Sequence, residues 1–175
     1  MRYNRKLFRF NSQRARKRLI DKADGVYLDV YNGRLLNSPK EFDAEHIFPL
    51  KSAWEQGFNK QHQINPEFAL ENMKKFSNDE RNLTIAGSSS NRSRGHKTLW
   101  NWSPLNLAWL PERNRIVREL AEDYGLVLTK PQQWAMDWSD EKITVKYKHG
   151  IALGKTRSWL VSHGFHKFLM PFPLF

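Results

Sequence analysis

The sequence predicts a small α+β domain, because segments with helical and with extended periodicity alternate along a chain of 175 residues. Two short apolar runs flank Asn32-Gly33, and this dipeptide between apolar runs is the strongest short signal of a β-hairpin. Apolar residues spaced three and four apart after Pro111 predict an amphipathic helix that ends at Gly125. The composition, with 39% hydrophobic and 13% aromatic residues, is sufficient for a buried core.

Extended segments are expected on both sides of the hairpin turn and twice more in the first half of the chain, at 26–30, 34–36, 42–48 and 82–86. A further strand is expected at 142–148, where Ile143, Val145 and Tyr147 alternate with lysine and threonine. Such a strand would carry a basic outer face.

Helices are expected where caps and apolar stripes coincide. Asn11 or Ser12 caps a helix that extends to about Ala23, and Asn65-Pro66 opens another that extends to about Phe76. The remaining helices are predicted at 50–56, where Gly57 ends the helix, in a short segment opened by Asn91, at 111–124, from Pro131 onward and near 157–162.

These elements divide the chain into three parts. Residues 1–25 form a basic arm, flexible over 1–10, and an N-terminal helix, residues 26–125 form a central core, and residues 126–175 form a C-terminal extension of helices and a strand that packs on this core.

The charge of the chain indicates a polyanionic partner. Lys and Arg outnumber Asp and Glu by 29 to 18, a formal net charge of +11. Nucleic acid is the commonest such partner, an anionic membrane surface is the alternative, and a basic protein without a polyanionic partner is the third interpretation. The basic arm and the strand at 142–148 are expected to add nonspecific phosphate contacts, so that affinity falls steeply with salt.

The chain has no cysteine, which excludes disulfides, zinc-thiolate sites and cysteine nucleophiles. No apolar run approaches the roughly 20 residues that span a bilayer, and the basic N-terminus lacks the apolar segment of a secretory signal. We therefore expect a cytoplasmic protein without a membrane partner.

The residues with the clearest chemical potential lie in the segment 43–50, where Glu45 precedes His46 near the end of a predicted strand. Adjacent strand residues point to opposite faces, so this pair can serve one site only if the backbone bends, which Pro49 favours. A second polar segment begins at Asn82 and continues with Asn91, with eight residues between the two asparagines.

Hydrolysis of a phosphodiester needs few groups. Histidine is the side chain whose ordinary pKa suits a base at neutral pH, so His46 is the candidate for deprotonating water. A hard cation such as Mg²⁺ prefers oxygen ligands, and the Glu45 carboxylate with the Asn91 amide oxygen would suffice. Cations that follow Asn91 are candidates for holding the scissile phosphate, namely Arg92, Arg94, His96 and Lys97.

Three blocks together resemble the HNH, or ββα-metal, nucleases. One HNH subfamily has the pattern Asp/Glu-His-Ile/Val-x-Pro-Leu-x-x-Ala-Trp-x-x-Gly, which is similar to Glu45–Gly57, and its other two blocks are similar to Asn78–Leu83 and Asn91–His96. The similarity covers roughly residues 26–125, and the joint occurrence of the blocks makes it specific.

The resemblance implies a ββα-metal core and a metal-dependent endonuclease that leaves 5′-phosphate and 3′-hydroxyl ends. It implies His46 as general base, Glu45 and Asn91 as ligands of Mg²⁺ (or of Mn²⁺ or another divalent cation in its place), and Asn82 as the residue that orients the loop holding His46. Arg92 or Arg94 would contact phosphate. The chain departs from the family at Asn91, where the common form has histidine, and at His96, where the subfamily has aspartate.

Each candidate also has a structural interpretation. Asn91 could simply cap a helix, and Glu45 could be a surface carboxylate without a ligand role. Asp43 is a competing metal ligand whose alternative is a solvated or hairpin-capping residue. Trp100 and Trp102 are expected in the core, with base stacking as the alternative.

Double-stranded DNA is the expected substrate, and two alternatives remain. One is a ribonuclease or toxin of the same fold, because a metal and a base recognise only the phosphodiester, and the other is a DNA-binding module without catalysis. An indiscriminate nuclease in the cytoplasm would damage its own cell. We therefore expect a restraint, such as a phage or defence setting, a regulatory or targeting protein, or selectivity for particular nucleic-acid features.

Overall fold

The computed structural model describes residues 2–95, 97 and 104–148 and has the mixed α+β character that the sequence predicts. The helices are α1 Ser12–Ala23, α2 Leu50–Ala53, α3 Asn59–Ile64, α4 Pro66–Asn78, α5 Ser88–Arg94, α6 Leu110–Asp123 and α7 Lys130–Lys148. Shorter helical turns are η1 Arg5–Phe8, η2 Pro39–Glu41, η3 Trp54–Phe58, η4 Glu80–Asn82 and η5 Leu107–Trp109.

The strands form two antiparallel pairs. β1 (Tyr27–Asp29) pairs with β2 (Arg34–Leu36), and β3 (Phe42–His46) pairs with β4 (Leu83–Gly87). The predicted hairpin turn is confirmed: Gly33 has φ +72°, and the Asn32 side chain accepts a hydrogen bond from the Arg34 N–H at 2.8 Å.

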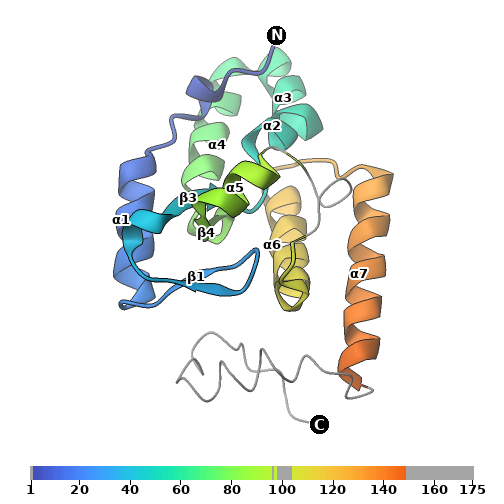
Figure 1. The fold of residues 1–175 in the computed structure, drawn as a ribbon. Helices are drawn as coiled ribbons and strands as arrows, with labels where there is room; N and C mark the ends of the chain where they lie inside the picture. Colours follow the sequence, from blue (N-terminus) through green and yellow to red (C-terminus); the bar gives the residue numbers. More distant parts are fainter. Residues whose placement is uncertain (1, 96, 98–103, 149–175) are drawn as a thin grey trace.

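The two faces of the β3–β4 pair are covered by different parts of the chain. On one face, the Arg16 guanidinium of α1 lies over the Phe42 ring, at 5.1 Å from its centroid. On the other face, α5 contacts both strands, and its side chains reach Asp43 and Glu45. Figure 1 shows α5 crossing over this strand pair, with α6 and α7 side by side beyond it. The strand pair therefore separates two environments.

A buried aspartate attaches the first hairpin to the start of α5. Asp29 is 1% exposed, and its carboxylate accepts hydrogen bonds from the Ser90 hydroxyl at 2.7 Å and from the Tyr31 N–H at 3.0 Å. A Cβ atom at Gly87 would lie 2.6 Å from the Asp29 carboxylate, so only glycine allows this close approach. The position of α5 thus depends on the hairpin as well as on the strands.

Gly57 marks a kink instead of the predicted helix end. The helical path from α2 continues through the π-helical turn η3 into α3, and Gly57 within η3 has non-helical dihedral angles. A Cβ there would lie 2.9 Å from the Leu126 side chain and 3.1 Å from the Gly125 carbonyl. The glycine is required by this close packing against the segment after α6, which no local pattern reveals.

Two further predictions about the elements are wrong. The segment 142–148 is the last part of α7 and not a strand. After Pro131 the sequence to residue 148 contains no proline or glycine, and extending an existing helix costs less than forming a strand without a partner. Asn91 lies inside α5, which begins at Ser88, so Asn91 does not cap that helix.

Several predictions lie outside the described residues. These are the helix near 157–162, the apolar end of the chain, the side chains of His96, Trp100 and Trp102, and the basic face expected at 142–148. None of the helices in the described part of the chain is long and apolar enough to cross a membrane.

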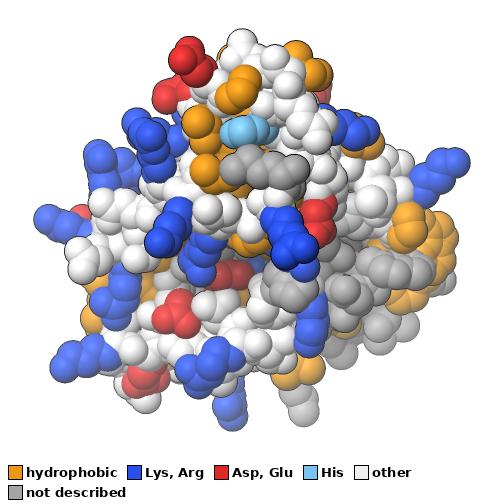
Figure 2. Space-filling model, turned by 90° about the horizontal axis from the view of Figure 1, so that it is seen from above, with side chains coloured by type: hydrophobic (Ala, Val, Ile, Leu, Met, Phe, Trp, Pro, Cys, Tyr) orange, Lys and Arg blue, Asp and Glu red, His pale blue; other side chains and the backbone are white. Residues whose placement is uncertain are grey.

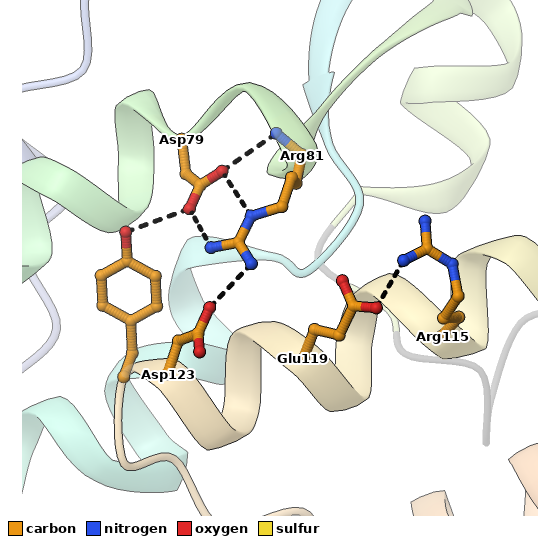
Figure 3. Close-up of polar contacts among 6 residues, drawn as sticks. Asp79, Arg81, Arg115, Glu119 and Asp123 are labelled. Carbon is orange, nitrogen blue, oxygen red and sulfur yellow. Dashed lines mark hydrogen bonds and ion pairs between the residues drawn. The ribbon is translucent and has the colours of Figure 1, made fainter.

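The turn that precedes Asn82 is fixed to α6 by a polar cluster (Figure 3). The Arg81 guanidinium binds Asp79 in a fork and donates to Asp123 of α6 at 2.7 Å, while the Tyr124 hydroxyl donates to Asp79 at 3.1 Å. Burial alone would raise the pKa of Asp79, but the hydrogen bonds from Arg81 outweigh it and hold that pKa below its ordinary value. The start of β4 is therefore held in place by contacts with the end of α6, which lies outside the sheet.

The N-terminal segment is not the flexible arm that the sequence predicts. Phe8 at the end of η1 is fully buried in the main core, where its ring lies edge-on to Phe58 at 5.8 Å between centroids, and Tyr3 packs against the same cluster. The Phe8 carbonyl accepts a 2.6 Å hydrogen bond from the Ser77 hydroxyl of α4. Burial of one phenylalanine thus fixes a segment whose charge suggests a solvated arm.

We predict that Phe8→Ala lowers the free energy of unfolding by about 3–5 kcal/mol, because it removes a buried ring and leaves a cavity. Phe68→Ala is the matched control, since that ring is 58% exposed and its loss should cost less than about 0.5 kcal/mol. Urea unfolding of the three proteins measures both changes. A flexible arm would instead give equal, small effects for the two variants.

Candidate functional site

A buried arginine joins α5 to the end of β3. Arg94 is 0% exposed, and its guanidinium forms an ion pair with the Glu45 carboxylate. It also donates to the carbonyl oxygens of His46 and Ile47, each at 2.7 Å. The Tyr31 ring lies beneath the guanidinium, with 5.4 Å from the Arg94 Cζ atom to the ring centroid. Arg94 thus fixes both the Glu45 side chain and the backbone that follows it.

Three oxygen-bearing side chains meet on the face of the strand pair that α5 covers. Asp43 and Glu45 are two residues apart on β3 and point to the same side, as the strand period requires. Asn91 of α5 donates from Nδ2 to the Asp43 carboxylate at 3.1 Å. Since an ionised carboxylate only accepts hydrogen bonds, the Asn91 nitrogen must face Asp43 and its oxygen is left for another partner.

His46 lies on the opposite face. β3 keeps its regular register with β4 through the pair His46 and Leu83, so the bend that the sequence led us to expect at 45–46 does not occur. The imidazole is 4% exposed, and its Nε2 lies 2.9 Å from the Ser77 carbonyl. The Phe10 ring packs edge-on against it at 4.4 Å between centroids. The structure therefore brings Glu45 and Asn91 to the same face and leaves His46 on the other.

The hydrogen bond to Ser77 determines the tautomer of neutral His46. A carbonyl oxygen only accepts, so Nε2 carries the hydrogen and Nδ1 keeps the lone pair. Burial lowers the pKa of His46 to about 4, against the opposing effect of the Ser77 carbonyl, and the charges of Arg5 and Arg94 lower it further. The ring is neutral at physiological pH.

Asn82 fixes the backbone that follows His46. The Asn82 side chain is fully buried, and its oxygen accepts a 2.7 Å hydrogen bond from the Phe48 N–H. The Asn82 carbonyl accepts a further bond from the Ile47 N–H at 2.8 Å. The chain after β3 is thus tied to the start of β4, which is itself fixed by the cluster around Arg81.

The predicted phosphate-binding residues lie in different environments. Arg92 and Lys97 are exposed, although the Lys97 ammonium donates to the Ser93 carbonyl at 3.0 Å. Arg94 is buried and bound to protein groups, so it offers nothing to a phosphate at the surface. His96 lies outside the described residues.

A second buried guanidinium lies near Arg94. Arg113 of α6 is 3% exposed, and burial together with the nearby charge of Arg94 lowers its pKa to about 9. Burial raises the pKa of the Glu45 carboxyl, while the charge and hydrogen bond of Arg94 oppose this rise. Glu45 is thus a largely desolvated carboxylate that depends on adjacent positive charge.

The donors on the α5 face suit a hard divalent cation. Glu45 uses one carboxylate oxygen for Arg94, and Asn91 uses its nitrogen for Asp43, so each side chain keeps an oxygen for a metal. Among the described residues, no group of three or more His, Cys, Asp or Glu side chains is placed to hold a metal ion. A metal held here would therefore rely on an amide and on water besides the carboxylates.

A cavity of about 540 Å³ lies beside this cluster and not within it. The β1–β2 hairpin and the first turn of α5 line it, and none of the predicted site residues does. The cluster itself lies between the strand pair and α5, outside this cavity.

The structure gives a role to two residues outside the predicted site. Asp43 is the competing ligand of the sequence analysis, and the two-residue period of a strand is the signal that places it beside Glu45. Phe10 belongs to the segment for which the sequence predicts a flexible arm. A phenylalanine pair, Phe8 and Phe10, within an otherwise basic segment was the available signal that the segment packs on the core.

No protein-family model, curated protein or solved structure matches this chain. A functional assignment rests on the side chains and contacts described above.

The lowered pKa of His46 predicts how stability depends on pH. Between the ordinary value of 6.5 and about 4, the unfolded chain binds a proton at residue 46 that the folded chain does not bind. The contribution of His46 to the free energy of unfolding is therefore largest above this pH range. It decreases as the pH falls through the range, by up to about 1.4 kcal/mol per pH unit.

His46→Gln is the informative variant, because glutamine can still donate to Ser77 but does not titrate. We expect the difference in unfolding free energy between wild type and variant to shrink as the pH is lowered from 7 to 4.5, as measured by urea unfolding at each pH. His62→Gln, on α3, is the control. A difference that stays constant for His46→Gln would contradict a buried neutral imidazole.

Proposed function

We propose that the protein is a divalent-metal-dependent endonuclease that hydrolyses phosphodiester bonds in DNA, with a ββα-metal core formed by β3, β4 and α5. The observation that carries this proposal is the convergence of Asp43, Glu45 and Asn91 on one sheet face, with Asn91 oriented by Asp43. Oxygen donors of this kind, on a chain with a net charge of +11, suit a metal that acts on a polyanion.

Glu45 and Asn91 would hold the metal, and Arg94 keeps the Glu45 carboxylate in place. A bound Mg²⁺ supplies positive charge that stabilises the transition state and the leaving oxygen. His46 would accept the proton of the attacking water at Nδ1, since Nε2 is engaged with Ser77. The attack in line on phosphorus breaks the P–O3′ bond and leaves 5′-phosphate and 3′-hydroxyl ends.

In this proposal the substrate would reach both faces at the edge of β3 that has no paired strand. β3 pairs with β4 alone among the described strands, so its other edge has no strand beside it. A phosphodiester placed along that edge near residues 45 and 46 lies close to both faces, and no backbone bend is then needed for the pair to act together.

One observation favours a second candidate, a nucleic-acid-binding module without catalysis. His46 is buried beneath Phe10, and its low pKa makes it a weak base in this conformation. Catalysis requires that water reach Nδ1 and that negative charge from the substrate raise the basicity of the ring.

Cleavage assays separate the candidates. Wild type is incubated with supercoiled plasmid or structured RNA, with Mg²⁺ or with EDTA. We expect cleavage of DNA with Mg²⁺ only, a loss of at least about 100-fold in His46→Ala and His46→Gln, and a comparable loss in Asn91→Ala. His62→Ala and Glu67→Gln, on α3 and α4, should cleave like wild type.

Equal cleavage by wild type and both His46 variants, each shown to be folded by circular dichroism, would remove His46 as the base. DNA binding without cleavage under any divalent cation would select the binding module. Cleavage of RNA alone would assign a ribonuclease of the same fold.

A further inference from the structure

The N-terminal segment Arg5–Phe10, termed the strap, is attached at the same point as His46. Ser77 of α4 accepts the His46 Nε2–H at its carbonyl and donates from its hydroxyl to the Phe8 carbonyl. The imidazole and the strap therefore share one anchoring residue. The buried Phe8 ring secures this attachment in the core.

The backbone of the strap has an unusual conformation directly beside His46. Arg9 has φ +47° and ψ +39°, in the left-handed region that non-glycine residues rarely adopt. This turn sends Phe8 into the core and places Phe10 against the His46 ring at 4.4 Å. Such a conformation persists only where surrounding contacts impose it, so the strap is a specific part of the structure.

Arg5 begins the strap, and its side chain is exposed. Asn4 caps η1 by accepting a hydrogen bond from the Lys6 N–H at 3.0 Å, which holds the start of the strap. Within the described residues, no hydrogen bond or ion pair engages the Arg5 guanidinium. The strap lies against His46 through the Phe10 ring and the shared residue Ser77. In keeping with this placement, the Arg5 charge adds to the lowering of the His46 pKa and opposes the rise that burial causes in the Glu45 pKa.

Three further arginines of this region, Arg94, Arg113 and Arg16, are buried or engaged elsewhere. The Arg94 guanidinium donates hydrogen bonds to Glu45 and to two carbonyl oxygens, and Arg113 is buried. Arg16 donates to the Pro39 carbonyl. Arg5 thus combines proximity to Glu45 and His46 with a free, solvated guanidinium, the group whose fork of donors matches a phosphate.

We infer that the strap is a phosphate-binding element of the nucleic-acid site, in which Arg5 holds a backbone phosphate beside Glu45 and His46 while Phe8 and Phe10 hold the strap in place. This inference rests on the proposed function, because it takes the nucleic-acid backbone as the ligand. Figure 2 shows Lys and Arg side chains spread over the face of the molecule seen from above, with acidic side chains among them. Arg5 differs from a general surface cation because its backbone belongs to a segment that is anchored beside His46 through Ser77 and Phe10.

The test uses the full chain and measures binding without metal, so that its result does not depend on whether wild type cleaves. A short fluorescent DNA duplex is titrated with wild type, Arg5→Gln and Arg14→Gln in EDTA at several salt concentrations, and anisotropy gives the affinity. Arg14 is the matched control, an exposed arginine on α1 that loses the same charge. Circular dichroism checks that all variants are folded.

We expect Arg5→Gln to weaken binding roughly tenfold and to reduce the slope of log affinity against log salt by about one, while Arg14→Gln changes the affinity less than about twofold. Arg5→Lys should restore the salt slope but only part of the affinity, because it keeps the charge without the fork.

Equal losses for Arg5→Gln and Arg14→Gln would overturn the inference, since Arg5 would then act only through net charge. Failure of wild type to bind duplex or single-stranded DNA at low salt would overturn it as well. A selective Arg5 effect without any cleavage by wild type would support the strap and reject the nuclease.

Discussion

The buried guanidinium of Arg94 is the interaction on which the rest of the site depends. A fully buried charge is costly unless it is paired and hydrogen-bonded. The two terminal nitrogens of Arg94 bind Glu45 and the carbonyl oxygens of His46 and Ile47, while its Nε has no hydrogen-bond partner among the described residues. These bonds hold α5 against the end of β3. The same placement brings Asn91, one turn earlier on α5, to Asp43. Arg94 thus sets the geometry of the cluster without meeting a substrate itself.

The two-residue period of β3 divides the site between two environments. Glu45 faces a polar cluster that suits a cation, whereas His46 faces Phe10 and Ser77 in surroundings that keep the imidazole neutral. The strap lies against the His46 side of β3. The strap, whose basic composition predicts a solvated arm, is therefore a packed part of the candidate site.

Local signals predicted the elements that depend on neighbours in sequence. The hairpin at Asn32-Gly33, the cap at Asn65 and the stripe after Pro111 needed no distant contacts, and the structure contains all three elements. The errors arise where tertiary contacts decide. Phe8 is buried by α4 and Phe58, Gly57 is required by Leu126, and residues 142–148 continue a helix that starts at Lys130. For the candidate site, the sequence singled out Glu45, His46, Asn82 and Asn91, and the structure brings Glu45 and Asn91, but not His46, to one face. The sequence could not show that Arg94 is buried, because an arginine after a polar loop ordinarily lies at the surface.

We propose that the α5 face holds one divalent cation through Glu45 and Asn91. Calorimetric titration of the protein with Mn²⁺, in the absence of nucleic acid, measures this directly. We expect one site per chain in wild type, and its loss in Glu45→Gln and in Asn91→Ala. Binding should be weakened in Asp43→Leu, because the Asn91 amide loses its orienting partner, and unchanged in Glu67→Gln. Equal Mn²⁺ binding by wild type and the Asn91→Ala variant, or no Mn²⁺ binding by wild type, would contradict this proposal.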